Sequence, residues 1–398
     1  MITGSNRGAD IEFTPALAEL LDRARNEKET NTTAADVAEL RDHPDILALM
    51  TRARQNEKNP PRKHHVVPAS YLRRWTNDRQ IRVTEIDEGR TYITTAEKAA
   101  RRTDYYSLAS DDLEPDELPP LLAETMLSDI ESLGKVAIDS LLSAGVEELS
   151  HENRSNLAIF LGFQYVRGES TRTMIRKIAN DAFKLEYGQL KEPGIRRTLK
   201  ERGLPVTSES IESVATFIRD LNDGILTVGP QKAAEVIQAF QAATKIAEHL
   251  FERSWAVFRT PAILLTCDEP VVPIGRSGQN RGERTGLAGA RVVVFPLAPD
   301  NLLVMFQHRP SAHALVPLTL SEIVEINHEV LANTARWAFE RPKRRTSIAL
   351  RVPSLPSATE VVEHRVAGKA NTSIIRLFRQ SRWAGDPHPP EWPLPRWP

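Results

Sequence analysis

Two adjacent histidines, His64 and His65, open a His-His-Val-Val-Pro segment that ends at Pro68 and is the sharpest chemical signature of the sequence. Imidazole binds metal ions when neutral and acts as a general acid or base near pH 7. If the segment is a strand, successive side chains point to opposite faces, so one histidine can face a site while the other packs elsewhere. Two uses stay open: a metal site, and a structural junction held by imidazole-to-backbone hydrogen bonds.

The pair is similar to the first half of a His-Asn-His nuclease, in which one histidine binds a divalent metal ion and the other activates water. The second half of that motif is missing, because no histidine occurs between His65 and His151, and Asn77 has no Asn/His helix after it. We therefore expect a differently assembled metal site for Mg²⁺ or Mn²⁺ rather than a standard His-Asn-His site.

Asp268 follows an apolar run of strand length, a position from which a carboxylate can project into a cleft and serve as a metal ligand. An Asp before Glu269 and Pro270 is also a good turn former, so capping is the alternative. The predicted metal set is His65, Asp268 and the helical Glu124.

Arg167 lies about one helical turn after Gln164, beside apolar residues that favour partial burial of both. Because a buried charge requires a partner, we expect Arg167 to contact a carboxylate, with Glu124, Glu131 and Asp268 as candidates. A structural ion pair is one interpretation. The other is an anion-binding arginine that steadies charge on a reacting phosphate next to His64, His65 and Asp268.

Basic and aromatic residues crowd the histidine pair: Arg62, Lys63, Arg73, Arg74, Arg101 and Arg102, with Tyr71, Trp75, Tyr105 and Tyr106 among them. Such a patch can hold phosphate and stack bases, although solvent-facing charged turns are commoner. From it we predict substrate contacts by Lys63, Arg73, Arg74 and Tyr71, together with Gln164. A second basic group, residues 341–345, could extend the same footprint.

The composition narrows the class of protein. The chain has 398 residues, with 52 basic against 53 acidic side chains and a net charge of −1, so any basic surface must be local. One cysteine, Cys267, excludes an intramolecular disulfide framework and a thiolate zinc site. Its position beside Asp268 fits a small apolar filler better than a nucleophile. With no leader and no apolar run near the ~20 residues that cross a bilayer, we expect a cytoplasmic location and no membrane contact.

Hydrophobic periodicity divides the chain into five segments. We predict an N-terminal helical extension (1–60), a small α/β unit with the histidine pair (61–117), a helical bundle (118–252), a β-sheet unit with a flanking helix (253–352), and a basic, Pro-rich tail (353–398) that is extended or disordered near its end. The helices are expected near 126–145, 152–187, 208–222 and 231–252, the strands at 81–86, 255–258, 263–266, 292–295 and 302–306, and a capping box of Thr319 with Glu322 opens a helix to about 340. The fold class is α+β with a mainly helical core and a C-proximal antiparallel sheet.

Several of these segments together resemble a bacterial "domain of unknown function" family that opens with a His-His-x-Val-Pro-x-x-Tyr-Leu element, here His64 to Leu72. The resemblance continues through the Phe160, Gln164 and Arg167 helix and through Thr266-Cys267-Asp268-Glu269-Pro270-Val271, where the family usually has Thr-Ser-Asp-Asn-Pro-Val. It covers roughly residues 62 to 340. The resemblance implies a fold but almost no mechanism.

We therefore expect a metal-dependent hydrolase of phosphodiesters, in the style of a nuclease used as a toxin or antiphage effector. In this interpretation His64 and His65 supply one ligand and one base, and Asp268 supplies a metal carboxylate. The alternative is a non-catalytic module that binds nucleic acid or a phage component, with the same residues forming a structural polar core. Convergence of a histidine, Asp268 and a helical Glu around one point would favour the enzyme. Homo-oligomer formation is a default expectation.

Overall fold

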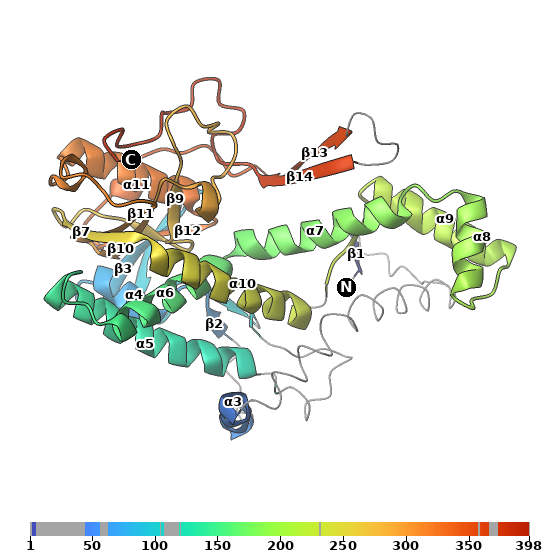
Figure 1. Cartoon of the computed structure of the whole chain (residues 1–398), viewed down its shortest axis with the longest axis horizontal. Helices are drawn as coiled ribbons and strands as arrows, with labels where there is room; N and C mark the ends of the chain where they lie inside the picture. Colours follow the sequence, from blue (N-terminus) through green and yellow to red (C-terminus); the bar gives the residue numbers. More distant parts are fainter. Residues whose placement is uncertain are drawn as a thin grey trace. The chain divides into compact units, whose positions relative to one another are not determined.

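The computed structural model describes residues 2–4, 44–55, 63–103, 105–106, 119, 121–230, 232–356, 359–365 and 373–397. These residues form an α+β fold with antiparallel sheets in the C-proximal region and a small N-proximal α/β unit (Figure 1). The chain separates into two compact units, one made of residues 1–59, 107–122 and 173–236 and the other of residues 60–106, 123–172 and 237–398. No described helix is long and apolar enough to span a membrane.

The first unit is built from helices. Its described elements are β1 (Ile2–Gly4), α3 (Pro44–Gln55), most of α7 (Glu169–Tyr187), α8 (Glu192–Glu201), α9 (Ser208–Asn222) and β6 (Leu226–Val228). Apolar residues of α8 and α9, among them Leu199 and Leu221, share a buried cluster. The predicted helix at 208–222 is confirmed residue for residue, and Thr207 caps it by accepting a hydrogen bond from the backbone of Ser210. Helix α8 was not predicted.

The second unit contains two four-stranded sheets, with strand orders β7-β11-β10-β9 and β4-β3-β12-β8. The first comprises β7 (Ser254–Arg259), β9 (Val272–Ile274), β10 (Val292–Ala298) and β11 (Asn301–Phe306), and the second β3 (Gln80–Glu85), β4 (Arg90–Thr95), β8 (Thr266–Cys267) and β12 (Trp337–Glu340). A short pair joins β2 (Lys63–His65) to β5 (Arg101–Thr103), and a separate hairpin joins β13 (Thr359–Arg365) to β14 (Ser373–Arg379). The strands predicted at 255–258, 292–295 and 302–306 are confirmed with small changes of boundary.

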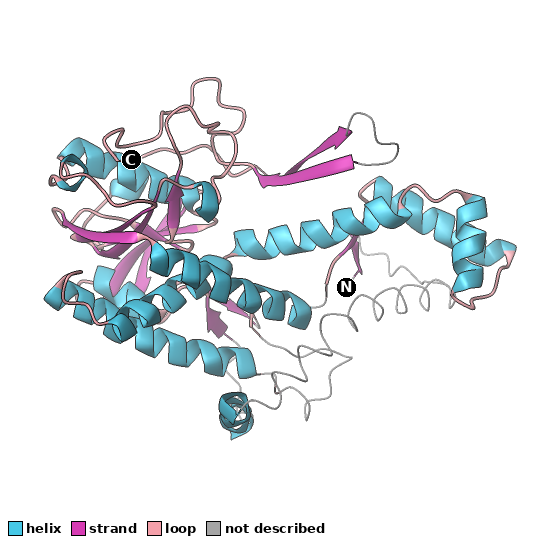
Figure 2. Ribbon diagram, viewed as in Figure 1, coloured by secondary structure: helices cyan, strands magenta, loops and turns pink. Residues whose placement is uncertain are grey.

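Helices cover the sheets of this unit on more than one side (Figure 2). They are α4 (Ala69–Leu72), α5 (Leu122–Ala144), α6 (His151–Val166), α10 (Lys232–Glu252), α11 (Leu320–Asn333) and α12 (Thr346–Ala349). Alternate residues of β10 serve opposite faces, as the period of a strand requires. Val294 joins a core cluster with Ile326 of α11, whereas Phe295 contacts Phe160 of α6 with ring centroids 6.3 Å apart.

The Pro-rich end of the chain, predicted as extended or disordered, is part of this core. Trp392, Leu394 and Trp397 belong to the same buried cluster as Val294. Arg291 holds the segment by donating hydrogen bonds to the backbone carbonyls of Pro393 and Trp397. Burial of three large side chains therefore fixes a segment whose prolines gave no sign of packing.

Three predicted elements differ from the structure. The helix expected near 152–187 is divided into α6 and α7 at residues 167–168. The capping box of Thr319 and Glu322 is confirmed, but α11 ends at Asn333 rather than near 340, and residues 337–340 form β12. In the run 263–266, only Thr266 is in a strand, because the side chain of Asn327 binds the carbonyl of Ile263 and the amide of Leu265. The sequence of this apolar run does not predict that a side chain from a helix will form hydrogen bonds with the backbone of the run.

Candidate functional site

The histidine pair lies on β2, which is antiparallel to β5, with His64 opposite Arg102 and His65 opposite Arg101. The two side chains have different environments, as the strand alternation predicted. The imidazole of His64 is buried and stacks on Tyr106, with ring centroids 5.8 Å apart and an interplanar angle of 11°. His65 is only partly buried.

The hydrogen bonds of His64 are those of a structural residue. Its Nδ1 accepts the backbone N–H of Tyr106 at 2.8 Å and lies 3.7 Å from a carboxylate oxygen of Glu124. A neutral imidazole that accepts at Nδ1 carries its proton on Nε2, so we assign Nε2 as a donor rather than a metal ligand. Burial raises the pKa of Glu124, which disfavours the carboxylate that a cation would require.

His65 retains more chemical freedom. Its Nε2 lies 3.0 Å from the carbonyl oxygen of Glu97 and 3.1 Å from Nε of Arg101. A protonated Nε2 suits the carbonyl, whereas an unprotonated Nε2 suits the arginine, so the two contacts favour opposite tautomers. Burial lowers the pKa of His65, and the ring is therefore neutral at pH 7.

Arg167, the C-cap of α6, is buried and uses all three guanidinium nitrogens inside the protein. It donates to Glu131 at 2.8 Å, to the hydroxyl of Tyr106 at 3.0 Å and to the carbonyl of His65 at 2.5 Å. The predicted contact with a carboxylate is thereby confirmed, with Glu131 as the partner. Arg167 joins β2, α5 and α6, and its burial with a contact at every guanidinium nitrogen removes it from a phosphate in solution.

Asp268 is buried, and its carboxylate serves as a backbone cap. The two oxygens accept the amides of Ala335, Arg336 and Trp337 at 2.8 to 3.1 Å, and the Asp268 amide donates to the carbonyl of Trp337. Burial raises the pKa of the Asp268 carboxyl to about 7, with Glu269 acting in the same direction and the amides against it. These three amides belong to the segment that leads into β12, after α11 has ended at Asn333.

The structure does not group the predicted metal set of His65, Asp268 and Glu124. Within the part of the chain that the structure describes, no three His, Cys, Asp or Glu side chains are grouped to hold a metal ion. The physical reason lies in the bonds already formed. Asp268 is held by backbone amides, and Glu124 faces His64 rather than His65.

Tyr71 and Gln164, predicted to contact substrate, are both buried. The Tyr71 hydroxyl lies 2.6 Å from the Thr266 hydroxyl and donates to the carbonyl of Pro296 at 2.7 Å. Gln164 donates to the carbonyl of Val66 at 3.4 Å. Trp75, Tyr105 and Tyr106 are buried as well, so this group cannot stack exposed bases.

The basic residues near the histidines are compensated by carboxylates. Arg73 lies 2.9 Å from Glu97, and Arg74 lies 2.7 Å from Asp139. Arg102 lies 2.5 Å from Glu169. The backbone of Lys63 is in β2, but its side chain lies outside the described part. Three arginines of the predicted phosphate patch are therefore paired with carboxylates, whereas Nε of Arg101 contacts His65.

A second basic surface lies at one end of the sheet that contains β3 and β12. We call it the basic turns: residues 77–79, which precede β3, and residues 341–345, which follow β12. The register pairs Glu340 with Arg82, whose guanidinium donates two hydrogen bonds to the carbonyl of Pro342. This contact anchors the second turn to β3.

The basic turns carry five cations: Arg79, Arg341, Lys343, Arg344 and Arg345. Arg341 is partly exposed and the other four are exposed. None of the five forms an ion pair or a side-chain hydrogen bond with a residue that the structure describes. Arg79 also has a φ of +62°, a strained backbone for a residue other than Gly, at the tip of its turn. From the sequence, residues 341–345 were predicted only to extend the basic patch beside the histidine pair. Arg79 was not predicted, although the preceding Asn77-Asp78 pair is typical of a turn.

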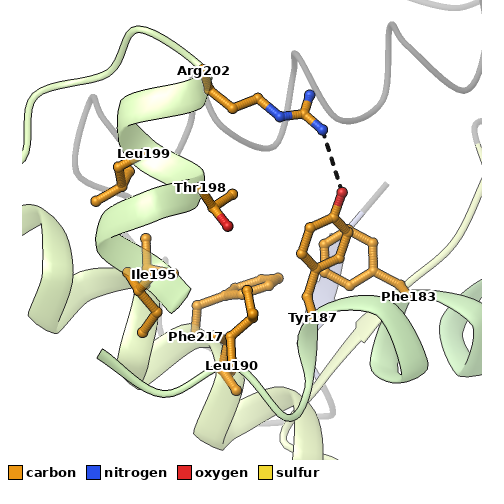
Figure 3. Close-up of a pocket in the computed structure, with 10 residues that line it drawn as sticks. Phe183, Tyr187, Leu190, Ile195, Thr198, Leu199, Arg202 and Phe217 are labelled. Carbon is orange, nitrogen blue, oxygen red and sulfur yellow. Dashed lines mark hydrogen bonds between the residues drawn. The ribbon is translucent and has the colours of Figure 1, made fainter. Parts of the chain in front are cut away.

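An apolar pocket of about 20 Å³ lies in the first unit, between α7, α8 and α9 (Figure 3). Its walls include Phe183, Leu199 and Phe217, and one hydrogen bond of 3.4 Å joins Arg202 to the hydroxyl of Tyr187 at its edge. Most of its lining belongs to the buried cluster of this unit. The pocket is a packing space of the helical core and offers little chemistry.

Comparisons with known proteins give one match. A family model described as "Protein of unknown function (DUF4238)" matches residues 63–344. No curated protein and no solved structure matches the chain.

Proposed function

The chain belongs to the DUF4238 family, whose description names no activity, and we propose that it binds the phosphate backbone of nucleic acid through the basic turns. The observation that supports this proposal is the lack of any carboxylate partner for Arg79, Arg341 and residues 343–345 among the described residues. Cations that are already paired gain little from a new anion, whereas unpaired cations release the counterions of each phosphate that they neutralise.

The form of the basic turns suits this role. Four of the five cations are arginines, whose planar guanidinium binds a phosphate with two parallel hydrogen bonds. The anchoring of Pro342 by Arg82 holds the second turn in place before a ligand arrives. Since the chain as a whole has a net charge of −1, attraction to a polyanion has to come from this local surface.

In the proposed complex the protein contacts the phosphate backbone of the nucleic acid rather than its bases. The aromatic residues beside the histidine pair are buried and cannot form a stacking platform. Contacts to phosphate position a protein but carry no sequence information by themselves. We therefore expect binding with little sequence preference and a steep dependence on salt.

The binding experiment measures the affinity of the full chain for labelled duplex DNA and RNA by fluorescence anisotropy at several salt concentrations. Arg344→Gln/Arg345→Gln is compared with Arg73→Gln/Arg196→Gln, which removes two exposed cations that already have carboxylate partners. In a plot of log affinity against log salt concentration, the first variant should reduce the magnitude of the slope by about 2, roughly 0.9 for each lost phosphate contact. The control should leave this slope nearly unchanged. Equal behaviour of the two variants would contradict the proposal.

A metal-dependent phosphodiester hydrolase is the second candidate, and the neutral, partly exposed His65 is the observation that favours it. The same samples are therefore incubated with Mg²⁺ or Mn²⁺ and analysed for cleavage products. If His65→Ala abolishes cleavage but retains binding, the protein is an enzyme rather than a binding module. Cleavage that survives His65→Ala would point to a contaminating nuclease.

A further inference from the structure

A small polar pocket lies in the second unit, and the residues that line it are far in sequence from the histidine pair. It is formed by the loop of residues 275–289, by α11 and by the C-terminal segment 381–392, and its volume is about 30 Å³. Its lining includes two arginines, Arg281 and Arg284, and two carboxylates, Glu283 and Glu329, together with Thr285, Trp383 and Trp392. The pocket therefore joins the glycine-rich loop to the packed end of the chain.

Arg281 is fixed in the wall of this pocket. Its two terminal nitrogens donate to the two carboxylate oxygens of Glu329 at 2.6 and 3.1 Å. Its guanidinium carbon lies 3.8 Å from the centroid of the Trp392 ring. Only 6% of the residue is exposed, and its Nε is buried with no hydrogen-bond partner in the described structure.

Arg284 is held in a similar way. Its Nη1 donates to Glu269 at 2.9 Å and to the hydroxyl of Ser170 at 3.0 Å, and its Nη2 donates to the carbonyl of Asn333 at 2.7 Å. Its Nε is again buried and lacks a partner among the residues that the structure describes. Both guanidinium groups are thus held in place while their Nε atoms have no partner among the described residues.

Two more lining residues have unused polar atoms. The indole Nε1 of Trp383 and the hydroxyl of Thr285 are buried without a partner in the described chain. The four residues that carry these atoms all line the pocket, and three of the atoms are N–H groups, which can only donate. The carboxylate of Glu329, which also lines the pocket, binds Arg281 rather than these atoms. A group rich in hydrogen-bond acceptors would satisfy them.

We propose that this pocket binds an oxyanion group, a carboxylate or a phosphate, which inserts oxygen atoms between Arg281, Arg284, Thr285 and Trp383. A volume of about 30 Å³ admits roughly two water-sized groups, which fits two oxygens of such a ligand and excludes a nucleobase. Because each arginine already has a carboxylate partner, hydrogen bonds rather than net charge select the ligand. This inference does not rest on the proposed nucleic-acid binding.

The pocket is tested by calorimetric titration of the full chain with acetate and with phosphate, at constant ionic strength, with chloride as the reference anion. Acetate represents a carboxylate source and phosphate a free phosphate source. We expect saturable binding of at least one of them with a stoichiometry near one. No saturable heat with either anion, as when ordered water alone fills the pocket, would overturn the proposal.

Variants assign the binding to the pocket. Thr285→Val and Trp383→Phe each remove one unused donor and should weaken anion binding by about 3- to 10-fold, the loss of one hydrogen bond. Thr216→Val, in the first unit, is the matched control and should bind as the native chain does. Arg344→Gln/Arg345→Gln should also retain anion binding, which separates this pocket from the basic turns. Unchanged affinity in both pocket variants, with native melting behaviour, would overturn the assignment.

Discussion

Two basic regions of this protein look alike in sequence and differ in structure. Around the histidine pair, Arg73, Arg74 and Arg102 each have a carboxylate within 3 Å, and Arg167 is enclosed. At the basic turns, Arg344 and Arg345 have no such partner among the described residues. The comparison teaches that a cluster of cations becomes a binding surface only where the fold leaves it uncompensated. Side chains that look catalytic because they are polar and close in sequence can instead hold a core together.

The largest expected effect comes from removing the enclosed cation. Arg167→Met leaves Glu131, Tyr106 and the carbonyl of His65 without their donor, and we expect a loss of about 3–5 kcal/mol in the free energy of unfolding. Arg344→Met at the basic turns should change it by less than about 0.5 kcal/mol. Urea unfolding measures both. If Arg167→Met were fully stable and lost nucleic-acid binding, the comparison between the two regions would collapse.

The cap formed by Asp268 gives the next largest effect. Asp268→Asn places an NH₂ group where two oxygens accept three amides, and we expect a loss of about 2–3 kcal/mol. Circular dichroism in urea measures the change, and Asp300→Asn provides the matched control. A native-like stability for Asp268→Asn, combined with reduced cleavage of nucleic acid, would return Asp268 to an active site.

The stability of the native chain should also depend on pH through Asp268. Its folded pKa of about 7 lies above the ordinary value of 3.8, so the folded protein takes up a proton before the unfolded chain does as the pH falls. This stabilising contribution is complete below about pH 4 and is lost as the pH rises through 7. Subtracting the profile of Asp268→Asn isolates it. A difference that is flat between pH 4 and 8 would show that the three amides offset the effect of burial.

Local signals in the sequence predicted much of the fold. Helical periodicity defined α9, and the capping box gave the start of α11. The rule that a buried charge needs a partner predicted a carboxylate for Arg167, and Glu131 is that partner. These predictions succeed because they depend on residues within a few helical turns, or on a requirement that holds for any fold.

The remaining features depend on contacts that the sequence does not show. Arg74 is neutralised by Asp139, 65 positions away, and Asp268 caps the start of β12 some 68 positions later. Neither partner has a distinctive local pattern. For this reason the candidate site in the structure is the basic turns and not the histidine segment. The sequence showed the histidines and the arginines near them, but not the carboxylates that pair with these arginines.

Tyr71 provides a smaller test of the same distinction. Tyr71→Phe removes a buried hydroxyl that contacts Thr266 and Pro296, and we expect a loss of about 1–2 kcal/mol with nucleic-acid affinity unchanged. Tyr92→Phe, on the partly exposed strand β4, should cost less. Thermal unfolding and anisotropy measure the two quantities. A loss of affinity without a loss of stability would restore Tyr71 as a substrate contact.

The smallest effect concerns the compensation itself. The hydrogen bond from Arg73 lowers the pKa of Glu97 to about 2, so Glu97 stays ionised, and Arg73 stays neutralised, until the solution is strongly acidic. Because the folded pKa is depressed, the contribution of the pair to stability is present above pH 4.5 and is lost as the pH falls toward 2. An NMR titration of the Glu97 carboxyl measures this pKa directly, and Arg73→Gln should return it toward 4.5. A Glu97 pKa near 4.5 in the native chain would mean that Arg73 is not neutralised by Glu97. Phosphate could then bind beside the histidine pair as well as at the basic turns, and the contrast between the two regions would fail.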